Sequence, residues 1–468
     1  MSQGRRACVS LYGRIVRTTV LPPYFRLRGY GELRCLRAME ETQWLSASET
    51  RERQWRELQR LLSYAYENIP FHRVRLGEAG LLPDELGDPD GLLKLPLLTR
   101  RELQEHEQAL RTPDWPEPDL AHDSTGGSTG EPVRVCFSRA SYDRRVASAS
   151  RSDRWAGWDY GERTAHLWGL DPNPGARSRL RRVLSQTYWA VRREKVFNAF
   201  APSDRTLEAT TRDLMQFRPQ MIIAYPTRAY EVARFMDANS LTGRIRPRGV
   251  ITSGEALEEY HRQQIQRAFG CSVFNRYGCR EFSLIASECE QHSGLHINSD
   301  NVYVEFLRDD GRPAAAGETA RLVITDLTNY AMPLIRYVIG DAGQSMGEQC
   351  PCGRGMPLMQ VVGRSCDTVV APDGRLLSGI FFGHLLKHIH GVRRFQVRQP
   401  DPTHVEVLLV PQASPAAINE QELRWALSQI VHALRSGVQV THRFVDDIPL
   451  TRSGKHQLVV SDVPVTYA

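Results

Sequence analysis

Residues 124–132 read Ser-Thr-Gly-Gly-Ser-Thr-Gly-Glu-Pro, the segment that most narrowly constrains how this chain can fold. Three glycines and four hydroxyl side chains in nine residues leave nothing apolar to bury, and glycine weakens both helices and strands. The segment is therefore a loop. It is either a flexible surface linker or a loop whose backbone N–H groups and hydroxyls surround an anion such as phosphate.

Two familiar phosphate-binding patterns do not fit this loop, because it lacks both a Gly-Lys pair and a G-x-G-x-x-G fingerprint. The pattern [ST]-[SG]-G-[ST]-T-G-x-P matches residues 125–132 at every position. In this loop the chain resembles the adenylate-forming superfamily of acyl-CoA synthetases, peptide-synthetase adenylation domains and luciferases. The resemblance implies that the loop closes over the β- and γ-phosphates of ATP, through Thr125, Gly126, Gly127, Ser128, Thr129 and Gly130.

Composition bounds the class of protein. A chain of 468 residues is long enough for two or three domains, and its 41% apolar and 24% charged residues are ordinary for a globular protein. The net charge of +6 is spread along the chain, so we expect no nucleic-acid partner. No apolar run is long enough for a transmembrane helix, and Arg14 and Arg17 interrupt any signal-peptide core. Nine scattered cysteines do not form a secreted disulfide framework, so we expect a cytoplasmic protein.

The order of sequence patterns predicts an α/β fold in two parts. Residues 47–110 are helical in pattern, and from about 140 to 345 helices alternate with short β-branched runs, which favours layers around a mostly parallel sheet. The last hundred or so residues read as an α+β unit. We expect a large adenylating domain over 1–363, with a helical leader over 1–110, and a small mobile domain over 364–468. The expected elements include strands at 221–224, 249–252, 321–325, 395–397 and 404–410 and a helix at 420–435.

Tyr277-Gly278-Cys279-Arg280-Glu281 matches the superfamily motif Y-G-x-x-E. The resemblance implies an aromatic ring near the adenine and a magnesium ligand, Glu281, since Mg²⁺ prefers carboxylate and phosphate oxygens. Alone, the same residues fit a turn before a helix better than a binding motif. The residues that the resemblance assigns to the nucleotide in this region are Ser253, Gly254, Glu255, Arg276, Tyr277 and Gly278.

Three further motifs follow in the superfamily's order. Arg336 to Asp341 resembles R-Y-x-x-G-D, whose aspartate accepts hydrogen bonds from the ribose hydroxyls. Residues 363–367 resemble G-R-x-x-D, which implies that Arg364 reaches the nucleotide and that Asp367 is the hinge between the domains. Residues 449–455 resemble P-x-T-x-S-G-K, whose lysine, here Lys455, bridges the attacking carboxylate and the α-phosphate.

The motifs, in this order over 330 residues, indicate the superfamily, and the segment 69–73, Ile-Pro-Phe-His-Arg, indicates its subgroup. It is similar to the phenylacetate–CoA ligase-like proteins, particularly those of capsular polysaccharide biosynthesis. Trp168, Tyr225 and Thr227 lie in regions that line the acyl pocket in such relatives, although packing in the core would explain Trp168 equally well.

A second group of residues is a candidate metal site. Cys289 lies three residues before His292 and seven before His296, and Cys350-Pro-Cys352-Gly follows later in the chain. Four nitrogen and sulfur ligands suit structural Zn²⁺, but the spacing alone does not establish the site. The resemblance favours zinc, with His296 as the fourth ligand and His292 as the alternative. A closed site leaves no open position for catalysis, so we expect a stabilising role.

The resemblance implies that ATP, with Mg²⁺, activates a small carboxylic acid as an acyl-adenylate, followed by transfer to an acceptor, with the CoA thiol as the leading candidate. Residues 368–375 read as a β-hairpin with an Asp-Gly turn rather than the usual glycine-rich stretch beside the thiol tunnel. An amine, a hydroxyl or a carrier protein is therefore the alternative acceptor. A degenerate, non-catalytic nucleotide-binding protein is the alternative from another class. The acid and the oligomeric state, including a homodimer, stay open.

Overall fold

The computed structural model places most of the chain. It describes residues 10–82, 87–113, 115–124, 133–168, 187–198, 204–308, 310–347, 349–364, 368–373, 375–386, 389–412, 414–435, 437–449 and 458–463.

Helices dominate the first part of the chain, as the leader pattern predicted. The helix α4 begins with a capping box, in which the Ser46 hydroxyl accepts from the Glu49 N–H and the Glu49 carboxylate accepts from the Ser46 N–H. Its apolar stripe, including Leu58 and Leu62, is fully buried. The helices are α1 Leu11–Ile15, a π-helical turn Val16–Val20, α2 Leu21–Arg28, α3 Glu32–Thr42, α4 Ala47–Asn68, α5 Pro70–Glu78, α6 Pro89–Leu92 and α7 Arg100–Glu105.

An antiparallel hairpin and a long helix follow. Strand β1 (Leu120–Ser124) pairs with β2 (Arg134–Ser138), so that Ser124 lies opposite Arg134. Helix α8 (Arg139–Trp155) begins directly after β2 and packs on α3 and on strand β8 (Ser283–Glu288).

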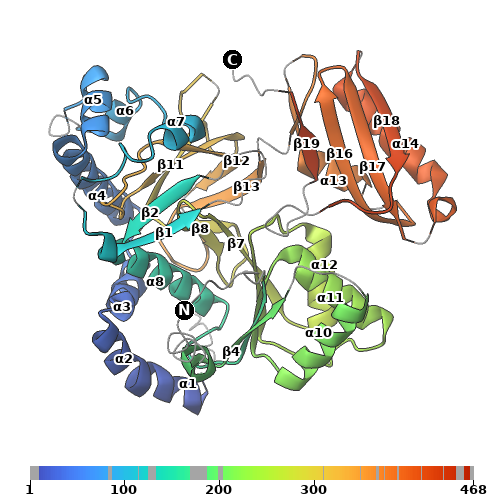
Figure 1. Cartoon of the computed structure of the whole chain (residues 1–468), viewed down its shortest axis with the longest axis horizontal. Coiled ribbons are helices and arrows are strands. Elements are labelled where there is room, and N and C mark those ends of the chain that lie inside the picture. The colour runs from blue at the N-terminus through green and yellow to red at the C-terminus, as the bar shows by residue number, and fades with distance from the viewer. Residues whose placement is uncertain are drawn as a thin grey trace.

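The centre of the molecule is an eleven-stranded sheet in the order β10-β11-β12-β13-β9-β8-β7-β6-β5-β3-β4. The strands β7-β6-β5-β3-β4 are parallel, because helices connect most of them and carry the chain back to the same edge. Figure 1 shows helices α10 to α12 covering this half of the sheet. The elements are β3 Thr164–Trp168, β4 Glu194–Asn198, α10 Asp204–Phe217, β5 Met221–Ala224, α11 Pro226–Ala238, β6 Gly249–Ser253, α12 Glu259–Phe269 and β7 Ser272–Cys279.

The other half of this sheet is antiparallel, because short turns and loops without helices join its strands. Its strands are β8 Ser283–Glu288, β9 Leu295–Ile297, β10 Val302–Leu307, β11 Ala320–Asp326, β12 Tyr337–Gly347 and β13 Leu358–Arg364. The large sheet is thus parallel where the sequence alternates between strands and helices and antiparallel beyond β7.

The last part of the chain forms its own sheet and core, at the right of Figure 1. The order of the four strands is β18-β17-β16-β19, and the hairpin β14–β15 confirms the turn predicted within 368–375. The elements are β14 Thr368–Val370, β15 Leu376–Ser378, α13 Gly379–Leu386, β16 Val392–Asp401, β17 His404–Pro411, α14 Glu420–Leu434, β18 Gln439–Phe444 and β19 Val459–Ser461. The predicted α/β class with a smaller α+β unit is confirmed.

Candidate active site and metal-ligating group

Two groups of the predicted nucleotide-binding residues lie where the parallel strands β6 and β7 end. Ser253 is the last residue of β6 and lies in register with Arg276 of β7. In open α/β sheets, ligands bind outside the carboxyl ends of the strands, and the change from parallel to antiparallel pairing occurs here at β7. Two sequence motifs that are separated by helix α12 therefore share one edge of the sheet.

Gly254 and Glu255 turn the chain away from this edge. Gly254 has a φ of +86°, which glycine adopts without strain. The Glu255 carboxylate accepts hydrogen bonds from the Thr227 hydroxyl at 2.6 Å and from the Thr227 backbone N–H at 3.2 Å. Thr227 lies in the first turn of α11, where unpaired N–H groups and the helix dipole favour an anion. Glu255 therefore ties the loop after β6 to α11.

Arg276 forms an ion pair deep in the protein. Its guanidinium donates to the Asp153 carboxylate of α8 at 2.6 Å, and both side chains are largely shielded from water. Burial raises the pKa of Asp153, and the charge of Arg276 opposes that rise. The pair fastens α8 beneath the end of β7 and thereby sets the position of the neighbouring Tyr277.

A short hydrogen bond joins two of the predicted motifs. The Tyr277 hydroxyl donates to Oδ2 of Asp341 at 2.6 Å, although the residues are 64 positions apart. Asp341 lies on β12, and its register partner on β13 is Arg364. The hydrogen bond thus connects β7 to β12, which are not neighbours in the sheet, and brings Tyr277, Asp341 and the backbone of Arg364 together.

The Y-G-x-x-E segment makes a tight turn that only glycine permits. A Cβ on Gly278 would lie 2.1 Å from the backbone oxygen of Ser283, across the β7–β8 pairing. Glu281 lies in this turn, is 5% exposed, and has Oε1 at 3.5 Å from the Tyr337 hydroxyl. Its backbone oxygen accepts from Arg145 of α8 at 2.9 Å. The turn therefore holds a buried carboxylate near the start of β12.

The sequence did not reveal the residues that support this carboxylate. Arg145 is buried, forms an ion pair with Asp326, and has its guanidinium 3.7 Å from the centre of the Phe137 ring. Because these partners come from α8, β11 and β2, no local pattern could have identified them.

The base of the glycine-rich loop lies beside the same turn. Asp123, on β1, forms an ion pair with Arg280 at 3.2 Å, and Arg280 directly precedes Glu281. The hairpin β1–β2 is thereby fixed next to the Y-G-x-x-E segment. The predicted phosphate-binding residues 125–130, the hinge Asp367 and Lys455 lie outside the described residues, as does the side chain of Arg364.

Two aromatic residues proposed for the acyl pocket lie together. The rings of Trp168 and Tyr225 are stacked, with centroids 4.3 Å apart and planes 16° apart. They follow from the neighbouring parallel strands β3 and β5, and Tyr225 is 7% exposed. Burial raises the pKa of Tyr225, so its hydroxyl stays protonated.

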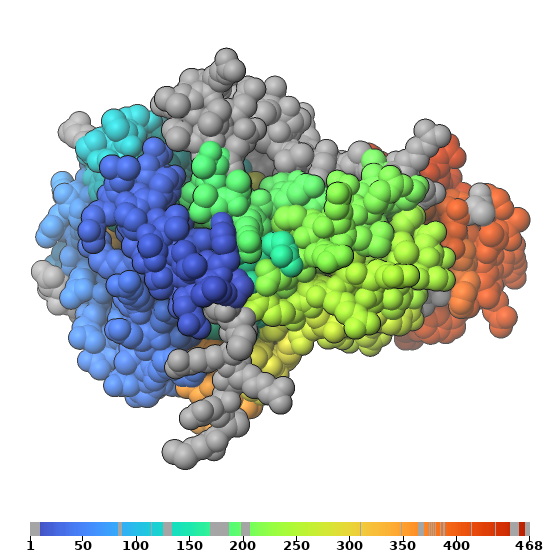
Figure 2. All heavy atoms as spheres, turned by 90° about the horizontal axis from the view of Figure 1, so that it is seen from below, coloured from blue at the N-terminus to red at the C-terminus, as the bar shows by residue number. Residues whose placement is uncertain are grey.

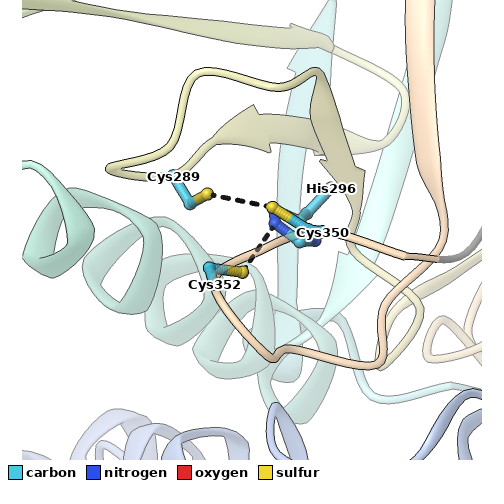
Figure 3. A group of neighbouring side chains, drawn as sticks. All are labelled: Cys289, His296, Cys350 and Cys352. Atoms are coloured by element: carbon cyan, nitrogen blue, oxygen red, sulfur yellow. Dashed lines mark hydrogen bonds between the residues drawn. The ribbon is translucent and has the colours of Figure 1, made fainter. Parts of the chain in front are cut away.

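The four preferred metal-ligand candidates form one cluster, drawn in Figure 3. Their nearest ligand atoms all lie within 4.8 Å of one another. The sulfurs of Cys289 and Cys350 are 3.7 Å apart, and the Cys352 sulfur is 3.3 Å from Nε2 of His296. In a tetrahedral zinc site with Zn–S of about 2.3 Å and Zn–N of about 2.0 Å, two sulfurs are about 3.8 Å apart and sulfur and nitrogen about 3.5 Å apart. A disulfide would need about 2 Å between sulfurs. The cluster therefore fits zinc.

The surroundings of the cluster orient its ligands. Nδ1 of His296 lies 3.2 Å from the Met356 backbone oxygen. If Nδ1 carries the proton, the lone pair of Nε2 faces the thiols and can bind a metal ion. The backbone N–H of Arg354 points at the Cys352 sulfur at 3.4 Å. Hydrogen bonding with Cys289 and His296 lowers the pKa of Cys352, which favours a thiolate. His292 instead lies 3.2 Å from the Glu288 carboxylate, outside the cluster.

The chain is similar to several known proteins. A family model described as the CapK C-terminal domain matches residues 369–462. A phenylacetate–CoA ligase of Thermus thermophilus is 28% identical over 70% of this chain and 74% of its own length. The protein CapK of Staphylococcus aureus is 20% identical over 79% of this chain and 80% of its own length.

A solved structure shares the fold over nearly the whole chain. A 2-hydroxyisobutyryl-CoA ligase in the postadenylation state superposes with a TM-score of 0.72 at 19% identity, covering 90% of this chain and 92% of that one. The same ligase in its thioesterification state gives 0.61. Together with the named relatives and the order of the motifs along the chain, this agreement supports the resemblance of the chain to the adenylate-forming superfamily and to phenylacetate–CoA ligase-like proteins.

Proposed function

We propose that this protein is an AMP-forming acid–thiol ligase, which activates a carboxylic acid with ATP and passes the acyl group to CoA. The observation that carries the proposal is the hydrogen bond from Tyr277 of β7 to Asp341 of β12, with the backbone of Arg364 opposite Asp341, which brings three separate motifs together. Relatives named phenylacetate–CoA ligase support the reaction class. The described sheet edge offers a buried acceptor for ribose hydroxyls, as a nucleotide site requires.

In the first half-reaction, a carboxylate oxygen of the acid forms a bond to the α-phosphorus, and the bond to the bridging oxygen breaks. Acyl-AMP and pyrophosphate result. Lys455 neutralises the negative charge of the attacking carboxylate and of the α-phosphate, because the repulsion between these two anions opposes the step. Asp341 and Arg364 hold the ribose, and residues 125–130 hold the pyrophosphate end. Ser253, Gly254, Glu255, Arg276, Tyr277 and Gly278 shape the wall of the nucleotide site.

Magnesium fits the site through Glu281. A bound Mg²⁺ would neutralise phosphate charge, and Glu281 supplies the kind of oxygen that this ion prefers. The turn that carries this carboxylate needs Gly278, and Arg145 holds the turn because it donates to the Glu281 backbone oxygen and forms an ion pair with Asp326. These contacts keep the carboxylate in place before the nucleotide binds.

In the second half-reaction, the CoA sulfur forms a bond to the acyl carbon, AMP leaves, and the thiol proton passes to solvent. We place the boundary between the domains at residue 364 and the hinge at Asp367. The separate core of residues 369–459 and the family match over 369–462 support a unit that moves as one body. Because the reaction needs ATP and CoA, we propose that the protein acts in the cytoplasm.

We also propose that Cys289, His296, Cys350 and Cys352 hold a structural zinc ion. The distances match a tetrahedral site, and all four positions around the ion would be filled by protein atoms. Such a site stabilises the fold and takes no part in the reaction.

An exchange assay tests the adenylation step. We expect a panel of aryl and aliphatic acids to include at least one that supports exchange of labelled pyrophosphate into ATP, and we expect Lys455→Ala to abolish it. Absence of exchange with every acid would exclude the enzyme. Exchange that survives Lys455→Ala would exclude the assigned mechanism.

A second assay identifies the acceptor. With the acid found by exchange, we expect CoA to convert acyl-AMP to a thioester that mass spectrometry detects. The favoured alternative, transfer to an amine, hydroxyl or carrier protein, rests on the hairpin β14–β15, which replaces the glycine-rich stretch. Exchange without any thioester would support that alternative.

A further inference from the structure

The first helical segment of the chain presents apolar side chains to water. Leu11, Ile15, Val20 and Leu27 are 74%, 46%, 39% and 85% exposed. They lie on α1, the π-helical turn and α2, within one stretch of 17 residues. Single exposed apolar residues are common, but four so close together mark an interaction surface.

The opposite side of the same segment explains why these residues cannot turn inward. Val16, Leu21 and Phe25 are at most 2% exposed and pack in the core with α3 and α8. The π-helical turn sets Val16 and Leu21 five residues apart and still keeps both buried. The segment is therefore fixed on the body by one face, and Figure 2 shows this first part of the chain, in dark blue, on the outside of the molecule.

The exposed face is also strongly basic. The sequence has six arginines and no Asp or Glu before Glu32. Arg17 is neutralised by Asp159 at 2.8 Å. Arg14, Arg26 and Arg28 are exposed, and within the described part of the chain they make no ion pair. Arg139 is a further exposed cation. It lies beside this segment because it donates to the Arg28 backbone oxygen at 2.7 Å.

We propose that this face, which comprises Leu11, Arg14, Ile15, Val20, Arg26, Leu27 and Arg28, docks the protein on an anionic phospholipid membrane. Arginines interspersed with exposed leucine and isoleucine on a helix that lies flat on the protein are the features of an interfacial segment. The apolar side chains would enter the headgroup region while the guanidinium groups bind lipid phosphates.

A second copy of the chain is a poorer occupant of this face. A symmetric contact would place Arg14, Arg26 and Arg28 against the same arginines of the other copy, with no acid from the segment between them. The membrane contact is peripheral, because within the described residues no helix is long and apolar enough to cross a bilayer.

Sedimentation with vesicles tests the proposal on the full chain. We expect binding to phosphatidylcholine vesicles that contain about one third phosphatidylglycerol, and weak binding to pure phosphatidylcholine. Replacing Arg14, Arg26 and Arg28 with Gln should reduce the partition coefficient at least tenfold, since each arginine contributes about fivefold. Raising the salt from about 0.05 M to about 0.5 M should weaken binding in the same direction.

A second variant separates the apolar contribution from charge alone. Leu11→Ser with Leu27→Ser should also reduce binding at least tenfold, because burial of each leucine favours the bound state. Trp425→Ser is the matched control: Trp425 is 58% exposed on α14 and should leave binding unchanged. Both changed positions of the apolar variant are exposed, so thermal unfolding should not change.

Three results would overturn the proposal. They are equal binding to neutral and anionic vesicles, binding unaffected by either variant, and a dimer in light scattering that dissociates when Leu11 and Leu27 are changed to Ser. The last result would assign the face to a second copy of the chain.

Discussion

Removal of the proposed zinc ion should cost the folded protein several kcal/mol of stability. The ion would join two connections of the chain, since Cys289 and Cys350 are 61 positions apart. If the ion constrains the unfolded chain as a cross-link does, closing a loop of that length contributes about 4 kcal/mol. The variant Cys352→Ser removes one ligand from an otherwise intact cluster, so we expect it to lose zinc and most of that free energy.

Zinc content and stability must change together for this reasoning to hold. We expect about one zinc per chain in the purified protein by elemental analysis, and none in Cys352→Ser. The pair His296→Asn and His292→Asn provides the control, because His296 faces the thiols whereas His292 lies outside the cluster. His292 has a φ of +50°, a conformation that asparagine tolerates.

The expected pattern is loss of zinc and a lower unfolding midpoint for His296→Asn, with both quantities unchanged for His292→Asn. A purified chain without zinc would refute the assignment. The assignment would also be refuted if Cys352→Ser kept one zinc per chain, or if zinc were lost with no change in the unfolding midpoint.

Four other substitutions test the fold and the site. Burial lowers the pKa of His72 to about 3. The unfolded chain therefore binds a proton at this residue between pH 6.5 and pH 3 that the folded chain does not, and the free energy of unfolding falls as the pH is lowered through that interval. The variant His72→Gln should remove this dependence, which is about 1.4 kcal/mol per pH unit in denaturant unfolding. Gly278→Ala should lower the unfolding midpoint and weaken ATP binding in calorimetry, because its Cβ would lie 2.1 Å from a backbone oxygen. Gly77→Ala, on α5 with nothing within 4 Å of the new Cβ, should instead stabilise the chain by about 0.5–1 kcal/mol, and a loss would contradict that geometry. Tyr277→Phe should lower the free energy of unfolding by about 1.5–3 kcal/mol, the usual contribution of a hydrogen bond to a carboxylate such as Asp341, and an unchanged value would argue against that bond.

The elements that sequence patterns predicted well are those with a strong local signal. The run at 221–224 is wholly buried as β5, and the expected helix at 420–435 is α14. Periodicity, caps and β-branched residues determine such elements over a few residues. The antiparallel half of the large sheet was not predicted, because pairing direction depends on which strands the connections bring together.

Side-chain partners in the site were beyond the reach of sequence patterns. The motif suggested a tyrosine ring near the adenine, but it did not suggest that the Tyr277 hydroxyl would bind Asp341. Nor did it suggest that Arg276 would pair with Asp153, 123 positions away. These contacts follow from how α8 packs under the sheet. The metal cluster was easier to predict, since few side chains other than cysteine and histidine suit zinc.

The metal cluster is attached to strands that also carry residues assigned to the nucleotide, so the proposed zinc would stabilise the nucleotide site as well as the fold. Cys350 and Cys352 lie in the connection between β12 and β13, the two strands that place Asp341 opposite Arg364. His296 lies on β9, which pairs with β13 on its other side. An ion held by both connections would fix the register of β13 against β12 without entering the reaction. Loss of zinc should therefore weaken nucleotide binding through the misplacement of Arg364, even though none of the four zinc-ligand candidates is among the residues assigned to the nucleotide.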